Sequence, residues 1–266
     1  MSTEGLHSTT VGSAGPFVVF LHGLFGRGRN FSTAAKALQP DARAVLVDLP
    51  NHGASPWTSH VDYRQMAGAV ADLLRAGPAV DGPVHVVGHS MGGKTAMALA
   101  LEHPELVDRL VVEDVSPGGT GEVSEFEHLL GSLARIDLAS VQSLRDADAQ
   151  LARDVPQPTL RGFLLQNLRR DDQGGFAWQA NLELLRRELP TITGDIPQVA
   201  GTASFDGPVL WVAGGESDYV SEDQGPLMRR LFPQTRKVTV KGATHWVHSQ
   251  RPEVFAEVLR RFLLDG

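Results

Sequence analysis

The segment Gly88-His89-Ser90-Met91-Gly92 constrains this chain more than any other, because it has the pattern Gly-X-Ser-X-Gly. An apolar, β-branched stretch precedes it at residues 83–87, and a helix-like stretch follows it at 93–101. A strand, a sharp turn and a helix are the context of a nucleophile elbow, which presents a serine on a tight turn. The helix N-terminus that follows favours negative charge at Ser90.

The same segment also fits the pattern of a phosphate-binding loop. Residues 88–95 read Gly-X-X-X-X-Gly-Lys-Thr, in which backbone N–H groups and the lysine would hold the phosphates of a nucleotide. Glu113 and Asp114 follow the apolar stretch 110–112, which resembles the strand and acid that hold the nucleotide's magnesium ion. A glycine-rich turn with no catalytic or binding role is the third interpretation. The other motifs of the chain distinguish it from the nucleophile elbow and the phosphate-binding loop.

Composition limits the classes of protein to which the chain can belong. Its 266 residues are 42% hydrophobic and 21% charged, which suffices for one large α/β domain or for a core with an insertion. The net charge of −7 and the lack of a Lys/Arg cluster argue against a nucleic-acid surface. The absence of cysteine excludes disulfides, thiolate catalysis and cysteine-bound metals.

The N-terminal sequence and the hydropathy indicate where in the cell the protein is expected. Residues 1–10 lack the basic and apolar regions of a signal peptide, and no apolar run approaches the length of a membrane span. We therefore expect a cytoplasmic protein that binds neither membrane nor nucleic acid and needs no metal ion or other cofactor. The sequence leaves the oligomeric state open.

Apolar runs alternate with helical patterns along most of the chain. This alternation predicts an α/β fold with a mostly parallel sheet and helices on both faces. The expected strands are residues 17–21, 44–47, 83–87, 110–112, 209–212 and 237–240. The expected helices cover residues 66–74, 91–103, 227–231 and 254–262.

The alternation stops between residues 118 and 205, after the strand that ends near Asp114. This stretch contains no convincing strand, and its apolar residues, including Phe126 and Trp178, recur at helical spacing. Gly-Pro-rich sequences bound it on both sides. We therefore predict a core formed by residues 1–117 and 206–266, with a helical lid at 118–205.

A glycine-containing loop follows the first expected strand at His22-Gly23-Leu24. An oxyanion hole needs one N–H from the residue after the nucleophile, here Met91, and one from a loop after an early strand, here Leu24. Residues 26–31 offer a dinucleotide-binding pattern instead, but Phe31 stands where its third glycine belongs.

A candidate base follows the last expected strand. His245 lies between that strand and the last helix, where the histidine of a Ser-His-acid triad is expected, and His248 is the alternative. Two carboxylates compete for the acid: Asp114, after the strand 110–112, and Asp218, after the strand 209–212. Both loops should lie at the carboxyl edge of the sheet, where ligands bind.

Six segments together resemble α/β-hydrolases of the serine-esterase type, close to the bacterial YbfF-type esterases and their mitochondrial relatives. The matching segments are residues 22–26, 48–56, 88–94, 112–117, 215–220 and 244–248. In many α/β-hydrolases the acid follows the later strand, but here Ser217 stands at that position. The resemblance to the YbfF-type pattern implies that Asp114 is the acid, with Asp218, one residue beyond Ser217, as the alternative.

The resemblance implies a serine hydrolase that cleaves small-to-medium uncharged carboxylic esters or thioesters through an acyl-enzyme. Phe25 and Trp246 are expected to line the substrate pocket on the core side. Acyl transfer to alcohols by the same triad is the alternative activity. A nucleotide-binding protein built on residues 88–95 explains fewer of the motifs, and the presence of Ser90 and His245 argues against a catalytically silent binding module.

Overall fold

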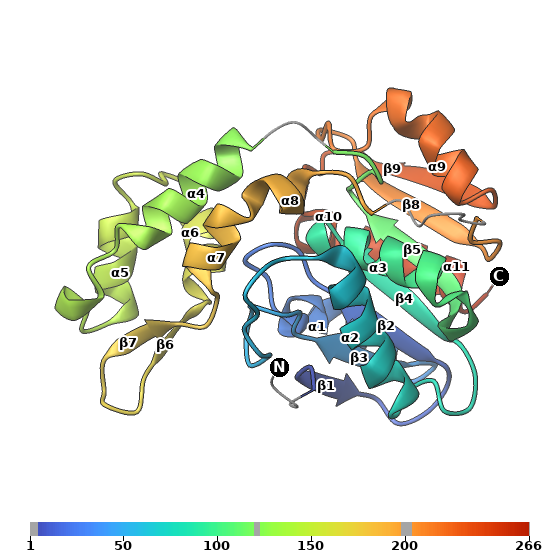
Figure 1. Ribbon diagram of the computed structural model, residues 1–266, viewed down its shortest axis with the longest axis horizontal. Helices are drawn as coiled ribbons and strands as arrows, with labels where there is room; N and C mark the ends of the chain where they lie inside the picture. Colours follow the sequence, from blue (N-terminus) through green and yellow to red (C-terminus); the bar gives the residue numbers. More distant parts are fainter. Residues whose placement is uncertain (1–4, 120–122, 198–203, 266) are drawn as a thin grey trace.

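The computed structural model describes residues 5–119, 123–197 and 204–265. Its core is a seven-stranded sheet (Figure 1) made of Ser8–Val11 (β1), Phe17–Leu21 (β2), Arg43–Val47 (β3), Val84–His89 (β4), Val107–Glu113 (β5), Val209–Gly214 (β8) and Thr235–Val240 (β9). The strand order is β1-β3-β2-β4-β5-β8-β9. β1 is antiparallel to β3, and the other neighbouring pairs are parallel.

Helices cover both faces of the sheet. Those of the core are Gly28–Phe31 (η1), Ser32–Ala37 (α1), Tyr63–Arg75 (α2), Met91–Glu102 (α3), Pro104–Leu106 (η2), Glu222–Gln224 (η4), Gly225–Leu231 (α9), Val247–Gln250 (α10) and Pro252–Leu263 (α11). Along β2, Val18 and Phe20 pack into one buried cluster with α1 and α11, whereas Val19 and Leu21 pack into another with α2 and α3. Burial on both faces explains the unbroken apolar runs, and the predicted α/β arrangement is confirmed.

Several short elements of the core, β1 and α1 among them, have no counterpart among the predicted ones. β1 is a Ser-Thr-Thr-Val segment whose side chains are mostly exposed, so it lacks the apolar alternation of a half-buried strand. Backbone pairing with β3 holds it in place, with Ser8 opposite Val47. α1 has six residues, too few to show a clear helical period.

Between β5 and β8 the described elements form an insertion to one side of the sheet (Figure 1). Its elements are Ser124–Ala134 (α4), Leu138–Ser140 (η3), Leu144–Leu151 (α5), Pro158–Leu165 (α6), Leu168–Arg170 (β6), Phe176–Trp178 (β7), Leu182–Arg187 (α7) and Leu189–Thr193 (α8). Residues 120–122 and 198–203 lie outside the described part of it. No helix in the described part of the chain has both the length and the apolar character that crossing a bilayer requires.

The β6–β7 hairpin corrects the expectation of an insertion without strands. Trp178, which the helical spacing assigns to a helix, pairs with Leu168 in this hairpin. The Asp171 side chain accepts the N–H groups of Gln173 and Gly175, which closes the connecting turn. Strands of three residues are too short to show an alternating pattern, so the periodicity gave no sign of them.

The turn between β4 and α3 brings three backbone segments into close contact. A Cβ atom on Gly88 would lie 2.3 Å from the carbonyl oxygen of Gly92, and one on Gly92 would lie 2.2 Å from that of Leu21. Glycine at both positions therefore allows α3 to start directly against β2 and β4. This contact fixes the N-terminus of α3 relative to the sheet.

We predict that Gly92→Ala destabilises the protein by about 1–3 kcal/mol, because the new methyl group meets backbone atoms that cannot move aside. Gly68→Ala on α2 is the matched control, since a Cβ atom there has no neighbour within 4 Å. The control should stabilise by about 0.4–1 kcal/mol through its effect on the unfolded chain. Urea denaturation measures both free energies of unfolding, and equal stability of the two variants would contradict the described contact.

Candidate active site

Ser90 occupies the turn between β4 and α3 in a strained backbone conformation. Its φ of 52° and ψ of −119° lie outside the regions that residues with side chains usually adopt. Its N–H donates to the Glu113 carbonyl at 3.1 Å, and its own carbonyl accepts the Lys94 N–H at 3.0 Å. The Ser90 side chain makes no capping hydrogen bond to the first turn of α3, so its hydroxyl is not committed to holding the helix.

The Asp114 carboxylate, fully buried after β5, accepts hydrogen bonds from three directions. Oδ2 lies 2.9 Å from His245 Nδ1 and 2.5 Å from Ser217 Oγ, and Oδ1 accepts the Gly214 N–H at 2.8 Å. Because Nδ1–H of His245 donates to a carboxylate, the other ring nitrogen, Nε2, is left as an acceptor.

The structure brings one of the two candidate acids to His245. Asp114 contacts it, whereas Asp218 is exposed and makes no contact with His245 within the described residues. Ser217 stands where the later acid is expected, and its hydroxyl donates to Asp114. The two loops therefore meet, as expected for the carboxyl edge of the sheet, and the carboxylate beside His245 comes from the loop after the earlier strand.

The loop after β2 lies directly against Ser90. A Cβ atom on Gly23 would lie 3.1 Å from Ser90 Cβ. His22 braces this loop, because its Nδ1–H donates to the Gly23 carbonyl at 2.8 Å and its Nε2 accepts the Leu49 N–H at 2.9 Å. With both ring nitrogens engaged in this way, His22 is held as one neutral tautomer.

The predicted oxyanion donors are the N–H groups of Leu24 and Met91. Met91 is the first residue of α3, and the first N–H groups of a helix have no partner inside it. Neither N–H has a protein acceptor among the residues that the structure describes. The chain turns sharply after Leu24, since Phe25 has a φ of 62°. Both donors thus belong to segments that flank Ser90.

Two amides of the insertion hold the same loop from the other side. Asn167, fully buried between α6 and β6, donates from Nδ2 to the Phe25 carbonyl at 2.7 Å. Asn30 Nδ2 donates to Gln166 Oε1 at 2.9 Å. The sequence analysis missed these residues, because single amides in a polar segment carry no pattern that singles them out.

Glu113, His248 and His89 form a second buried group. His248 Nδ1 lies 2.8 Å from Glu113 Oε1, the His248 N–H donates to the same oxygen, and His89 Nε2 lies 2.9 Å from the His245 carbonyl oxygen. Burial alone would raise the pKa of Glu113, but its electrostatic interactions with His248 and His89 and its hydrogen bonds from His248 lower it. The three ligand atoms lie within 4.8 Å of one another, as in a metal site, yet each side chain already has a protein partner. We interpret the group as an anchor for α10 and the loop that carries His245.

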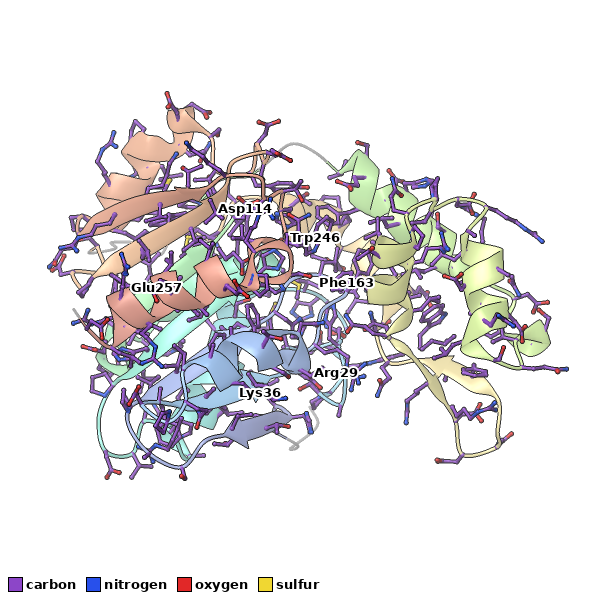
Figure 2. All side chains as sticks on the ribbon, turned by 180° about the vertical axis from the view of Figure 1, so that it is seen from behind. Arg29, Lys36, Asp114, Phe163, Trp246 and Glu257 are labelled. Carbon is purple, nitrogen blue, oxygen red and sulfur yellow. The ribbon has the colours of Figure 1, made fainter. Side chains whose placement is uncertain are left out.

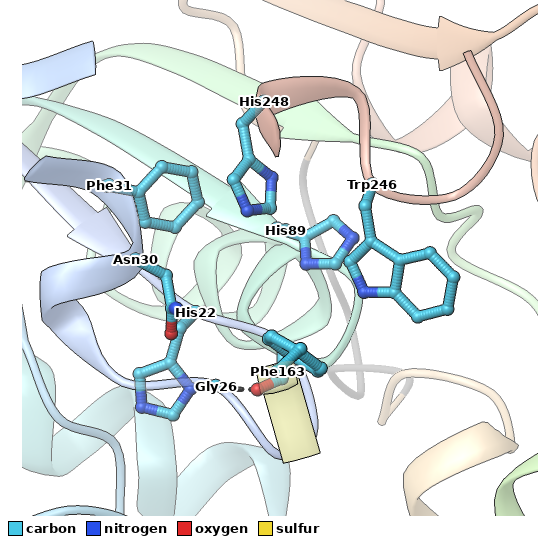
Figure 3. Close-up of a pocket in the computed structure, with 9 residues that line it drawn as sticks. His22, Gly26, Asn30, Phe31, His89, Phe163, Trp246 and His248 are labelled. Carbon is cyan, nitrogen blue, oxygen red and sulfur yellow. Dashed lines mark hydrogen bonds between the residues drawn. The ribbon is translucent and has the colours of Figure 1, made fainter. Parts of the chain in front are cut away.

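A small pocket lies between the core and the insertion (Figure 3). Phe163 from α6 and Trp246 from the core face each other beside it, with ring centroids 6.2 Å apart (Figure 2). Trp246 lines this pocket, whereas Phe25 is buried elsewhere and packs on Phe126 with ring centroids 6.4 Å apart. That Phe25 and Trp246 line the substrate pocket remains a prediction. The lining residues are His22, Gly23, Gly26, Asn30, Phe31, His89, Phe163, Trp246 and His248.

The geometry does not fit a phosphate-binding loop at residues 88–95. Such a loop needs its lysine to face the bound phosphates. Lys94 is only 1% exposed, and its ammonium bonds to backbone carbonyls of the insertion. The glycines of the segment serve close packing, as described above for Gly88 and Gly92.

Three buried histidines of the core are neutral in the folded protein. Burial lowers the pKa of His22 to about 4 and that of His52 to about 3, and it lowers the pKa of His89 well below the usual value. The unfolded chain, in which a histidine has a pKa of about 6.5, therefore binds more protons than the folded protein in mildly acidic solution.

We predict that stability is lost as the pH falls from about 6.5 to about 4, by up to about 1.4 kcal/mol per pH unit for each of these three groups. The sign follows from their depressed pKa values, because protonation favours the unfolded chain. Urea denaturation at neutral and mildly acidic pH measures the effect. His52→Asn should reduce the pH dependence, whereas His60→Asn, at an exposed histidine, should keep it. An unfolding midpoint that does not change with pH would contradict this account.

Comparison with known proteins identifies the family of this chain. A family model described as alpha/beta hydrolase fold matches residues 16–252. The chain is 41% identical over 254 residues to the sn-1-specific diacylglycerol lipase ABHD11 of Mus musculus, covering 93% of this chain and 81% of that protein. It is 32% identical over 250 residues to the esterase YbfF of Escherichia coli strain K12, covering 93% of each.

A solved structure, described as a marine microorganism esterase, superimposes on this chain with a TM-score of 0.92. The two are 31% identical, and the match covers 97% of this chain and 99% of the other, so it includes the insertion as well as the core. The predicted resemblance to YbfF-type esterases is confirmed. The chain therefore belongs to the α/β-hydrolase family and is an ester hydrolase of that family.

Proposed function

We propose that Ser90, His245 and Asp114 are the catalytic triad of this ester hydrolase and that the N–H groups of Leu24 and Met91 form its oxyanion hole. The observation that carries the proposal is the buried contact of 2.9 Å between His245 Nδ1 and Asp114 Oδ2. This contact leaves Nε2 of His245 to take a proton, and Ser90 stands on the strained turn that a nucleophile elbow requires.

In the proposed reaction, the Ser90 oxygen attacks the ester carbonyl carbon while its proton passes to His245 Nε2. The negative charge on the former carbonyl oxygen is stabilised by the two N–H donors. The bond to the alcohol then breaks, and His245 returns the proton to the departing alcohol. In the second half, water attacks the acyl-Ser90 while its proton passes to His245; the bond to the Ser90 oxygen then breaks, His245 returns the proton to that oxygen, and the carboxylic acid leaves. Asp114 holds the Nδ1–H tautomer and stabilises the imidazolium.

We also propose that residues 118–205 act as a lid that shapes an acyl pocket. Phe126 on α4 packs near His245, with ring centroids 6.3 Å apart, and Phe163 on α6 faces Trp246. Apolar walls with few polar groups favour uncharged acyl chains of small to medium length. The name of the mouse relative, a diacylglycerol lipase, supports an uncharged ester of this kind. We expect such a small-molecule ester, met in the cytoplasm, as the substrate.

Initial rates on p-nitrophenyl esters of increasing chain length test the proposal. Ser90→Ala should lower kcat/KM by about 10⁴–10⁶ without changing the circular dichroism spectrum. Ser249→Ala, at an exposed position on α10, is the matched control and should keep the wild-type rate. Wild-type activity in Ser90→Ala would overturn the proposal. An added alcohol that captures the acyl group in place of water would identify acyl transfer.

The assignment of the acid gives a separate prediction. Asp114→Asn should lower kcat by about 10⁴, because an amide at this position favours the wrong tautomer of the imidazole. Asp218→Asn should keep the wild-type kcat, since its side chain is exposed. Steady-state kinetics on both variants, each checked by its thermal unfolding, make the comparison. A large loss of kcat in Asp218→Asn together with a wild-type kcat in Asp114→Asn would place the acid on the later strand.

A further inference from the structure

Lys94 carries a charge in the interior of the protein. It lies on α3, and its side chain is only 1% exposed. Burial lowers its pKa to about 8, although the nearby Asp195 carboxylate opposes this effect, so the amine remains an ammonium at neutral pH. A buried charge is costly unless hydrogen bonds compensate it, and the triad does not use this one.

The partners of this ammonium come from both ends of the insertion. Lys94 Nζ donates to the Gly118 carbonyl at 3.2 Å and to the Thr193 carbonyl at 3.4 Å, and it also contacts the Gly194 carbonyl. Gly118 lies where the chain enters the insertion, and Thr193 ends its last described helix, α8. An ammonium has three N–H donors, which matches three carbonyl oxygens.

The same two segments also bond directly to each other. The Ile196 N–H donates to the Pro117 carbonyl at 2.9 Å, and the Gly119 N–H donates to Asp195 Oδ1 at 2.6 Å. Lys94 adds the link from this junction to α3, and its own N–H donates to the Ser90 carbonyl one turn earlier. A single side chain therefore connects the nucleophile helix with both ends of the insertion.

We propose that Lys94 is a positioning residue that ties both ends of the insertion to α3 and thereby holds the insertion closed over Ser90. This deepens the proposed function, because it rests on residues 118–205 acting as a lid. A lysine suits the task because one flexible stem delivers three donors to two separate segments. A methionine of similar length would fill the space but leave those carbonyls without these hydrogen bonds.

Hydrogen exchange measured by mass spectrometry on Lys94→Met tests the proposal without substrate. Exchange in peptides that cover residues 117–119 and 193–197 should accelerate by about tenfold or more, while β4 and β8 keep the wild-type rates. Lys36→Met, at an exposed lysine on α1 (Figure 2), is the matched control and should leave all of these peptides unchanged. If Lys94→Met does not fold, Lys94→Gln, which retains two N–H donors, replaces it, and exchange is compared between the same peptides and β4 and β8.

Kinetics on the same variants separate positioning from general stability. Lys94→Met should change KM for a medium-chain ester more than KM for an acetate ester, with little change in kcat for acetate. Unchanged exchange at both ends of the insertion, or equal acceleration in β4 and β8, would overturn the proposal. Full activity of Ser90→Ala would instead overturn the proposed triad and leave the exchange result valid.

Discussion

The close packing of backbone where β4 turns into α3 is the constraint on which the rest of the site depends. Because Gly88 and Gly92 carry no side chain, α3 starts against the Leu21 carbonyl, and Ser90 is held at a φ of 52° between strand and helix. The same packing sets the loop after β2 beside the N-terminus of α3. Backbone contacts therefore position the proposed nucleophile and both N–H donors before a substrate binds, which is the arrangement that stabilises an oxyanion most effectively.

Two adjacent acids at the end of β5 reach different histidines. β5 ends at Glu113, and Asp114 follows it with a φ of 50°, so the backbone turns between the two carboxylates. Glu113 accepts both the side chain and the backbone N–H of His248 and so anchors α10, while Asp114 accepts His245. One strand end thus fixes the position of the loop and the orientation of its imidazole. Ser217 completes the arrangement with a hydroxyl that donates to Asp114.

The hydrophobic pattern of the sequence predicts the strands of the sheet and the loops that follow them. Strands buried on both faces give unbroken apolar runs, and parallel strands place the segments that follow them, with Ser90 and His245, at the same edge of the sheet. The choice between Asp114 and Asp218 depends on side-chain direction at strand ends, which the residues alone leave open. Lys94 fits a phosphate-loop pattern because a motif cannot show whether a lysine faces a ligand or the carbonyls of a segment about a hundred residues away.

Labelling with a fluorophosphonate, followed by digestion and mass spectrometry, tests the central claim most directly, because this reagent reacts with an activated serine hydroxyl. The account predicts one phosphonyl group per chain, carried by the peptide that contains Ser90. The label should be absent from Ser90→Ala and form far more slowly in His245→Ala. A label on another serine, or a wild-type protein that binds ATP and takes up no label, would contradict it.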